Sequence, residues 1–557
     1  MTLKRTAPLV LLTAAALSIS ACAESQRDDS GTGGNGSSDV KDTITFGAAG
    51  APELFDPLYA TDGETFRVTR QIHSGLLGIK PGTADVEPEL AESWEPSEDG
   101  LSWTFKLRQG VTFSDGEPFN AEAVCYNLDR MYNQEGAGQT AAEYWTYFFG
   151  SFSDDPEGSL YKSCEAQDES TAVINVTRTT SSFPTILTLD SFSIQSPKAL
   201  EEGDANNVQA EGEGFTYPEY SKNPVGIGPY KLESYDEANK TVTLVANESY
   251  YGEQPKTAKL VFKIIPDEST RRQELQAGSI DGYDLPNPVD WQGLEDAGNK
   301  VEVRPAFNIL YMGLNPERNP KLQDLKVRQA IAHALNREQM VQSQLPEGAT
   351  VASQFMPEAV SGYDESLEPY PYDPEKAKSL LKEAGAEGMT LKFAFPTEVS
   401  RPYMPDPQKI HAAFVKDLEA AGFTVEQVSK PWNGGYLDDV SANGAYDAWL
   451  LGWTGDYNAA DNFLGTFFSN LKSNDFHTSV MPWGKTLAED LKKADAVVDE
   501  DERATTYQDI NRRIAEEYLP GIPISHSPPA LVTSGKVDGL VASPLTAEEF
   551  DTVTVGK

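Results

Sequence analysis

Apolar and polar residues alternate along several stretches of the first half of the chain. The alternation over 42–49 predicts an opening strand, and the clearer alternation over 101–113 predicts a hairpin or meander. Residues 230–252 predict two strands joined by a polar turn, and 258–265 predict one more strand. Strands are therefore the main elements that the pattern predicts in this half.

Helical spacing of apolar residues appears elsewhere and becomes clearer in the second half. Residues 121–132 predict a helix with one apolar face, made by Val124, Leu128 and Met131. Residues 322–341 predict a longer helix, in which the spacing is carried by Leu325, Ile331, Ala334 and Leu335.

Capping and stop signals set the ends of three further helices. In 372–385, Asp373 is a suitable N-cap, Pro374 suits the first helical position and Gly385 is a stop. Residues 408–428 predict a helix, a glycine stop and a strand. Residues 503–524 predict a helix that ends before a proline and is followed by an apolar strand. Helices and strands alternate irregularly, which indicates an α/β fold with mixed sheets.

The N-terminal residues have the features of a bacterial export signal. Lys4 and Arg5 precede an apolar or small-residue run over 7–19, which is too short for a comfortable transmembrane helix. Residues 19–22, Ile-Ser-Ala-Cys, resemble a lipobox. The resemblance implies cleavage before Cys22 and diacylation of its thiol, and the alternative is an ordinary secretion signal with a chance cysteine.

The segment that follows is rich in Gly, Ser and Asp. This composition predicts that 22–41 form a flexible linker between a signal peptide, 1–21, and the body of the chain. Residues 42–557 contain no second long apolar stretch and are numerous enough for two or three lobes. We expect an extracytoplasmic protein tethered by lipid to the outer face of the cytoplasmic membrane.

The charge balance is strongly acidic. The formal net charge is -41, from 86 acidic and 45 basic residues. Such a surface repels polyanions, which argues against nucleic acid and anionic lipid headgroups as partners. It does not restrict a small ligand, which senses the local field within a Debye length.

Apart from Cys22, the chain contains two cysteines, Cys125 and Cys164. In an oxidising compartment an even pair favours a disulfide, and two separate buried thiols are the alternative. A metal site is not expected, because no histidine lies near either cysteine in sequence.

The catalytic motifs that we considered are absent from the sequence. There is no Gly-x-Ser-x-Gly elbow and no His-Glu-x-x-His motif, and Trp-Gly-Lys-Thr at 483–486 lacks the first glycine of a phosphate loop, since position 479 is Ser. The histidines are scattered without metal-ligand spacing, at His73, His333, His411, His477 and His526. We therefore expect neither an enzyme nor a bound cofactor or metal, with an unrecognised hydrolase as the alternative.

Four motifs, in the right order, resemble the extracytoplasmic solute-binding proteins of peptide-importing ABC transporters, family 5. They are the Pro-x-Leu-Ala-x-Ser-Trp to Gly-Val-x-Phe-x-Asp-Gly stretch in 86–124, the Pro-Val-Gly-x-Gly-Pro-Tyr in 223–235, the Val-Arg-x-Ala-Ile segment in 314–341 and the helix in 372–385. The similarity spans residues 43–540.

The resemblance implies a periplasmic-binding-protein type II (cluster C) fold, with a ligand held between two hinged lobes and an extra inserted domain. Lobe I would comprise 40–91, 225–305 and 515–557, the inserted domain 92–224 and lobe II 306–514. Both remaining cysteines would lie in the inserted domain. The expected partners are short peptides, an ABC permease and its ATPase, and the chain itself is expected to be a monomer.

The chain is most similar to the dipeptide-binding branch. Residues 400–406 resemble its Arg-Pro-Tyr-x-Pro, and 452–463 resemble its Gly-Trp-Thr-Gly-Asp to Asp-Asn-Phe segment. The resemblance implies that Arg401 binds a peptide carboxylate with support from Tyr403, and that Asp456 binds the α-ammonium.

Aromatic residues near these two motifs complete the expected site. Trp453, Trp432 and Tyr436 can supply apolar walls with polar edges, and Gly455 belongs to the Asp456 motif. Where the branch has Asp-Pro after the aspartate, this chain has Ala459-Ala460. That departure leaves the expected peptide length open. Relatives on this scaffold also bind oligosaccharides, metal chelates or opines, so a non-peptide ligand is the alternative.

Overall fold

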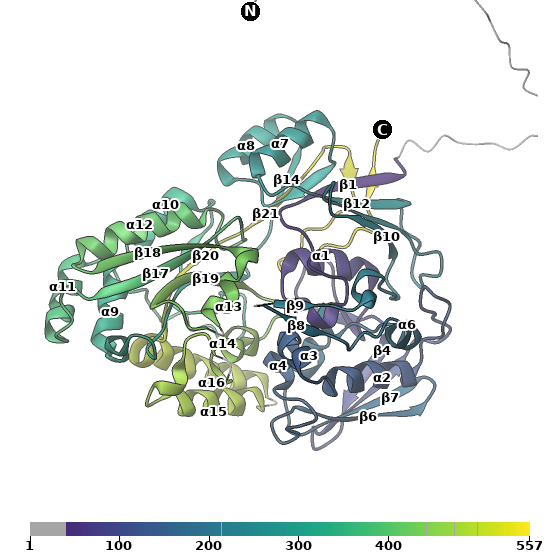
Figure 1. Ribbon diagram of the computed structural model, residues 1–557, viewed down its shortest axis with the longest axis horizontal. Helices are drawn as coiled ribbons and strands as arrows, with labels where there is room; N and C mark the ends of the chain where they lie inside the picture. Colours follow the sequence, from purple (N-terminus) through teal and green to yellow (C-terminus); the bar gives the residue numbers. More distant parts are fainter. Residues whose placement is uncertain (1–40, 213, 442, 473, 498) are drawn as a thin grey trace, which may run out of the picture. The chain divides into compact units, whose positions relative to one another are not determined.

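Three β-sheets of four or more strands organise the part of the chain that the computed structural model describes, which is residues 41–557 except 213, 442, 473 and 498. We call the seven-stranded sheet with its helices lobe I, the six-stranded sheet with its helices lobe II, and the four-stranded sheet with its helices the inserted domain (Figure 1). The expected signal peptide 1–21, Cys22 and all but the last residue of the linker 22–41 lie outside the described residues.

The sheet of lobe I is mixed, because β1 runs parallel to both of its neighbours while the outer pairs are antiparallel. In order across the sheet the strands are β10 (Tyr230–Asp236), β11 (Thr241–Ala246), β12 (Lys259–Ile264), β1 (Thr43–Ala48), β13 (Gly282–Asp284), β21 (Ala530–Thr533) and β14 (Lys300–Val303). Its helices are α1 (Gly63–Ile72), α7 (Glu268–Ala277) and α8 (Trp291–Asp296). The strands predicted over 42–49, 230–252 and 258–265 are confirmed.

The central strands of the sheet of lobe II pack against an apolar core on each face. In order its strands are β16 (Thr350–Val351), β20 (Gly521–His526), β15 (Asn308–Leu314), β19 (Ala448–Thr454), β17 (Thr390–Thr397) and β18 (Thr424–Pro431). Side chains alternate along a strand, so Leu450 of β19 packs into one core while Leu451 packs into the other. Figure 1 shows α9–α12 around this sheet and α14–α16 on its other side.

The helices of lobe II confirm most of the predicted boundaries. They are α9 (Leu325–Ala334), α10 (Arg337–Gln344), α11 (Pro374–Glu383), α12 (Pro407–Ala420), α13 (Tyr436–Val440), α14 (Thr466–Phe468), α15 (Gly484–Asp495) and α16 (Glu500–Arg513). Asp373 caps α11 by accepting from the Lys376 amide, as predicted, and Gly385 adopts a positive φ of 62° just beyond it.

The single helix predicted over 322–341 is wrong, because α9 and α10 are separate. Leu335 leaves the helical conformation, and the side chain of Asn336 accepts a hydrogen bond from the Gln339 amide at 3.1 Å. Asn is a strong N-cap, and this local bond starts a new helix. The apolar spacing continues across the break, which explains why the pattern missed it.

The inserted domain contains an antiparallel sheet in the order β4 (Ala91–Pro96), β5 (Ser102–Leu107), β7 (Thr171–Val176) and β6 (Tyr161–Asp168). Its helices are α2 (Ala121–Tyr132), α3 (Ala137–Ala141), α4 (Glu143–Phe149), α5 (Phe183–Ile186) and α6 (Pro197–Glu202). The alternation over 101–113 forms β5, which makes an antiparallel hairpin with β4 and pairs with β7 at its other edge, so the predicted hairpin is confirmed. Among the helices of the described residues, none is long and apolar enough to cross a bilayer.

A disulfide joins Cys125 of α2 to Cys164 of β6, with the two Cα atoms 5.1 Å apart. It fixes the helix to an edge strand of the inserted sheet. The pairing predicted from the cysteine count is therefore confirmed.

Two short segments connect the sheets of lobes I and II. The chain passes from β14 to β15 through 304–307 and returns from β20 to β21 through 527–529. The segments are hydrogen-bonded to each other: the Arg304 amide donates to the Pro529 carbonyl at 2.8 Å, and the Asn308 side chain donates to the Ser527 carbonyl at 2.7 Å.

The border expected at 514 and 515 does not coincide with either crossing. Strand β20 belongs to the sheet of lobe II, where it pairs with β15. We propose that lobe II extends through β20 and that the last part of lobe I begins near residue 527. The other borders remain proposals, with the inserted sheet starting at Ala91, one residue before the expected 92–224.

Candidate functional site

A cavity of about 200 Å³ lies at the carboxyl end of β19. It is lined by α1 of lobe I, α4 of the inserted domain, and β19, α13 and the 401–403 segment of lobe II. The wall combines aromatic rings with several charged side chains, which is typical of a small-molecule site.

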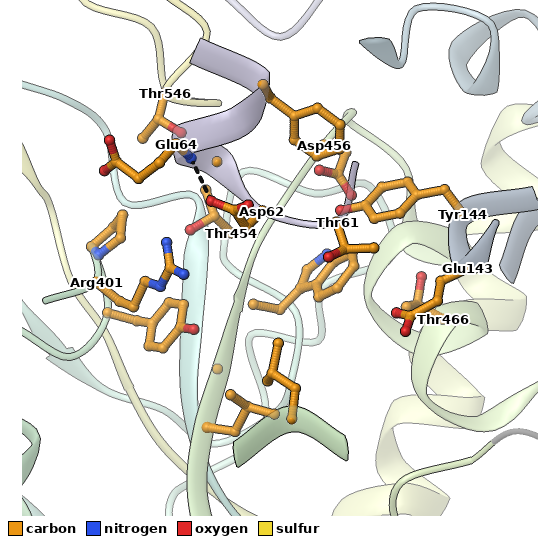
Figure 2. Close-up of a pocket in the computed structure, with 18 of the residues that line it drawn as sticks. Thr61, Asp62, Glu64, Glu143, Tyr144, Arg401, Thr454, Asp456, Thr466 and Thr546 are labelled. Carbon is orange, nitrogen blue, oxygen red and sulfur yellow. Dashed lines mark hydrogen bonds between the residues drawn. The ribbon is translucent and has the colours of Figure 1, made fainter. Parts of the chain in front are cut away.

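Asp456 lies in this cavity two residues beyond β19. Its amide donates to Oδ1 of Asn462 at 2.8 Å, and Nδ2 of Asn462 donates to its Oδ2 at 3.3 Å. Figure 2 shows the Tyr144 side chain reaching from α4 toward the Asp456 carboxylate. Burial raises the pKa of Asp456 to about 7, although Asn462, Arg70 and Tyr144 each act to lower it. The carboxylate is thus oriented but not neutralised.

Arg401 lies on the other side of the cavity from Asp456 (Figure 2). A short turn holds its backbone, with the Arg401 and Met404 amides and carbonyls exchanging hydrogen bonds of 3.1 and 2.9 Å. Its guanidinium stacks over Trp432, 4.2 Å from the ring centroid, and its buried Nε has no hydrogen-bond partner in the protein. Arg401 forms no ion pair within 4 Å of a described residue, and its charge acts to lower the pKa of the cavity-lining Glu64.

Tyr403 forms part of the floor of the cavity. It is buried, and a Cβ at position 452 would lie 2.4 Å from its ring, so Gly452 of β19 is what makes room for it. Burial raises the pKa of Tyr403 to about 12, so it is a neutral phenol at physiological pH.

Comparison with known proteins places these features in a family. The model of bacterial extracellular solute-binding proteins, family 5, matches residues 85–475. The chain belongs to this family.

Relatives of this family 5 protein are similar over nearly their whole length. The dipeptide-binding protein of Escherichia coli is 31% identical over 92% of this chain and 94% of that protein. Heme-binding protein A of Haemophilus influenzae is 30% identical over 98% of both. The ABC transporter-associated periplasmic binding protein from Helicobacter pylori, solved in complex with the peptide STSA, superposes with a TM-score of 0.79 at 26% identity and covers 93% of this chain and 99% of that one.

Family membership agrees with the two-lobe type II fold and with action outside the cytoplasm. The relatives reported above are binding proteins rather than enzymes. Within the described part of the family 5 protein, no group of three His, Cys, Asp or Glu side chains is arranged to hold a metal ion.

The structure brings most of the predicted site residues to the cavity wall. Those that line it are Asp456, Arg401, Tyr403, Trp453 and Trp432. The indole of Trp453 donates to Oδ1 of Asn462 at 3.3 Å and stacks on Tyr144, with centroids 6.4 Å apart. The side chain of Asn462 is hydrogen-bonded to both Trp453 and Asp456. Asn462 belongs to the 452–463 segment, but the sequence analysis does not predict it as a site residue.

Two predicted residues lie behind the wall instead of in it. Tyr436 is fully buried, and its hydroxyl donates to the Leu450 carbonyl at 2.8 Å. Gly455 is packed so closely that a Cβ there would lie 2.3 Å from the ring of Phe307. Both support the site through packing, and neither lines the cavity.

The Ala459-Ala460 departure also lies outside the cavity wall. Ala459 packs against the apolar core of lobe I and the inserted domain, whereas Ala460 is buried in a core of lobe II. The loop behind Asp456 therefore touches apolar side chains of different parts of the protein.

Sequence reasoning missed the walls contributed by α1 and α4. The α1 residues Glu64, Arg67 and Arg70 and the α4 residues Glu143, Tyr144 and Tyr147 line the cavity. Neither helix carried a motif, and α4 was not predicted at all, since 143–149 is a short run rich in aromatic residues without clear helical spacing.

A buried charge network supports the α1 wall. Arg67 and Arg304 both pair with Asp284, the latter at 2.8 Å, and Arg304 also pairs with Glu548 at 2.7 Å. Burial alone would raise the pKa of Asp284, but the two guanidinium groups outweigh it and lower the pKa to about 2. Because Arg304 lies in the crossing between the lobes, this network fixes α1 beside the crossing.

Proposed function

We propose that the protein captures short peptides in this cavity and delivers them to an ABC permease and its ATPase. The observation that carries the proposal is the pair of opposite charges, Asp456 and Arg401, that line one cavity from different sides. A short peptide at neutral pH carries an ammonium group at one end and a carboxylate at the other, which matches this pair.

The environment of each charge supports this assignment. A peptide loses water at both ends when it enters a closed cavity, so each end needs a fixed counter-charge. Asn462 and Tyr144 orient Asp456 without supplying a positive charge, and Trp432 packs against the Arg401 guanidinium, whose Nε has no hydrogen-bond partner in the protein. A planar guanidinium matches a carboxylate better than an ammonium group would.

The aromatic wall accounts for tolerance of different side chains. Trp432, Trp453 and Tyr403 offer large apolar faces without a shape that selects one residue. Recognition through the two termini then leaves side-chain identity largely free.

The proposed cellular setting follows from the N-terminal sequence and the family. Cleavage before Cys22 and lipidation of its thiol would tether a monomeric receptor to the outer face of the cytoplasmic membrane. The linker over 22–41 would let the receptor reach its permease.

The experiment compares peptides with free and N-acetylated termini by isothermal titration calorimetry. We expect the wild type to bind free di- and tripeptides, and Asp456→Asn to weaken their binding by at least about tenfold, since it leaves a buried ammonium without a counter-charge. N-acetylated peptides should bind the wild type and the variant alike.

A broad peptide panel that produces no binding heat and no thermal shift would exclude the proposal. Haem and sugar ligands belong in the same panel, because binding of one of these instead of peptides would identify a different cargo. Equal losses for free and N-acetylated peptides in Asp456→Asn would contradict the ammonium role.

A further inference from the structure

Besides Asp62, which caps α1, two carboxylates in the cavity remain without a counter-charge after the peptide termini are assigned. Glu143 is the first residue of α4, and Asp475 lies in the loop between α14 and α15. Neither forms an ion pair with a described residue. The phenol of Tyr147 donates to Glu143 at 3.4 Å, which is a long and weak hydrogen bond.

The two carboxylates come from different parts of the protein and line the same cavity. Glu143 belongs to the inserted domain and Asp475 to lobe II. Burial raises the pKa of Glu143 to about 7, with Asp475 as the next cause, and burial raises the pKa of Asp475 to about 6. Two ionised acids that line one cavity repel each other, and a cation bound beside both would remove that repulsion.

A buried hydroxyl in the same cavity is also left without a partner. The Oγ1 atom of Thr466 is buried and makes no hydrogen bond within the protein. Figure 2 shows Thr466 on the same side of the cavity as Glu143. Because a buried hydroxyl usually has a partner, Thr466 is available to a polar group of a ligand in this cavity.

Apolar surface close to these groups suits a long aliphatic chain. Phe467 and Phe476 line the cavity beside Thr466 and Asp475 in sequence. Lysine and arginine side chains combine an apolar stem with a charged end, so the stem would lie on these rings while the charge reaches the carboxylates. The basic side chains of the cavity wall are Arg70, Arg67 and Arg401. Arg70 already acts on Asp456, and Arg67 already pairs with Asp284.

We infer that Glu143 and Asp475 form a subsite for a basic side chain of the bound peptide, so that the protein prefers short peptides containing lysine or arginine. Thr466 donates or accepts a hydrogen bond at the same end of the subsite. This inference rests on the proposed peptide-binding function and specifies its substrate class.

Calorimetry with Ala-Ala, Lys-Ala and Ala-Lys tests the subsite. We expect the wild type to bind the better of the two lysine peptides at least about tenfold more tightly than Ala-Ala, as for a desolvated charge pair. In the double variant Glu143→Gln and Asp475→Asn this ratio should fall toward one, because the lysine peptides lose both carboxylates.

A matched control is Glu135→Gln, an exposed acid of the same inserted domain that does not line the cavity. It should leave the lysine preference unchanged. Thermal unfolding checks the fold of each variant. If the double variant is unstable, the two single variants test the subsite, since each should lower the ratio of the Ala-Ala Kd to the lysine-peptide Kd part of the way.

A wild type that binds Ala-Ala and both lysine peptides equally would overturn the inference, and so would a preference that survives both single variants. Either result would leave the proposed function intact. Failure of every peptide to bind would instead contradict the proposed function itself.

Discussion

At the scale of single residues, Asp456 is an acid whose neighbours orient it but do not neutralise it. It is half-buried, and the groups that face it are Arg70, Tyr144 and Asn462. Because burial outweighs these neighbours, the pKa rises to about 7 in the absence of peptide. Burial disfavours the ionised form of Asp456, and the ammonium group of a bound peptide would stabilise that form.

Peptide affinity should therefore depend on pH in a defined direction. Above pH 7 Asp456 is ionised and can hold an ammonium group, and below pH 7 it becomes neutral and cannot. We expect the Kd of Ala-Ala to increase by at least about tenfold between pH 7.5 and pH 5.5, while the peptide ammonium stays protonated. Calorimetry at both pH values, with N-acetylated Ala-Ala as a control that has no ammonium, measures the effect. A profile for the free peptide that is no steeper than that of the N-acetylated control would show that Asp456 is not the group that binds the ammonium.

At the scale of elements, the disulfide between Cys125 and Cys164 connects α2 to the edge strand β6 across 39 residues of sequence. Replacing both cysteines with alanine should lower the free energy of unfolding by roughly 4 kcal/mol, because the bridge restricts the unfolded chain. Urea unfolding followed by circular dichroism measures the loss. Neither cysteine lines the cavity, so the peptide Kd should change by less than about twofold. An unaltered unfolding midpoint would contradict the stabilising role of the bridge.

Elements that sequence reasoning recovered are those whose signals are local. The alternation in 258–265 and the caps of α11 depend on neighbouring residues, and the structure confirms both. Asp456 and Arg401, which the sequence motifs predict, both line the cavity. The break at Asn336 was missed, because one side-chain hydrogen bond outweighs apolar spacing that runs on past it.

The remainder of the site depends on contacts between distant parts of the chain. Glu143 and Tyr144 reach the cavity because α4 packs beside the loop that follows β19, some 310 residues away in sequence. No periodicity or motif encodes such a contact. Tyr436 is the opposite case: the sequence predicts that it lines the cavity, but the packing of α13 buries it behind the cavity wall.

At the scale of the whole molecule, a second contact besides the cavity joins lobe II to the inserted domain. Asp495, the last residue of α15, accepts a hydrogen bond from the Ser182 hydroxyl at 2.6 Å and another from Thr180. The Ser181 amide also donates to the Asp495 carbonyl at 3.0 Å. These bonds lie apart from the charges that we assign to the peptide termini, because neither Asp495 nor these hydroxyl residues line the cavity.

This contact should contribute to affinity for every peptide equally. In a two-lobe receptor, an interaction between lobes that forms on closure adds its free energy to ligand binding. Ser182→Ala removes one charge-assisted hydrogen bond, so we expect the Kd of free and N-acetylated peptides alike to increase by about tenfold. Ser221→Ala is the matched control, since Ser221 is also buried but its hydroxyl makes no hydrogen bond. Calorimetry on both variants separates two cases: a lower melting temperature with unchanged Kd would mean that the contact persists without peptide, and a uniform loss of affinity would mean that closure forms it.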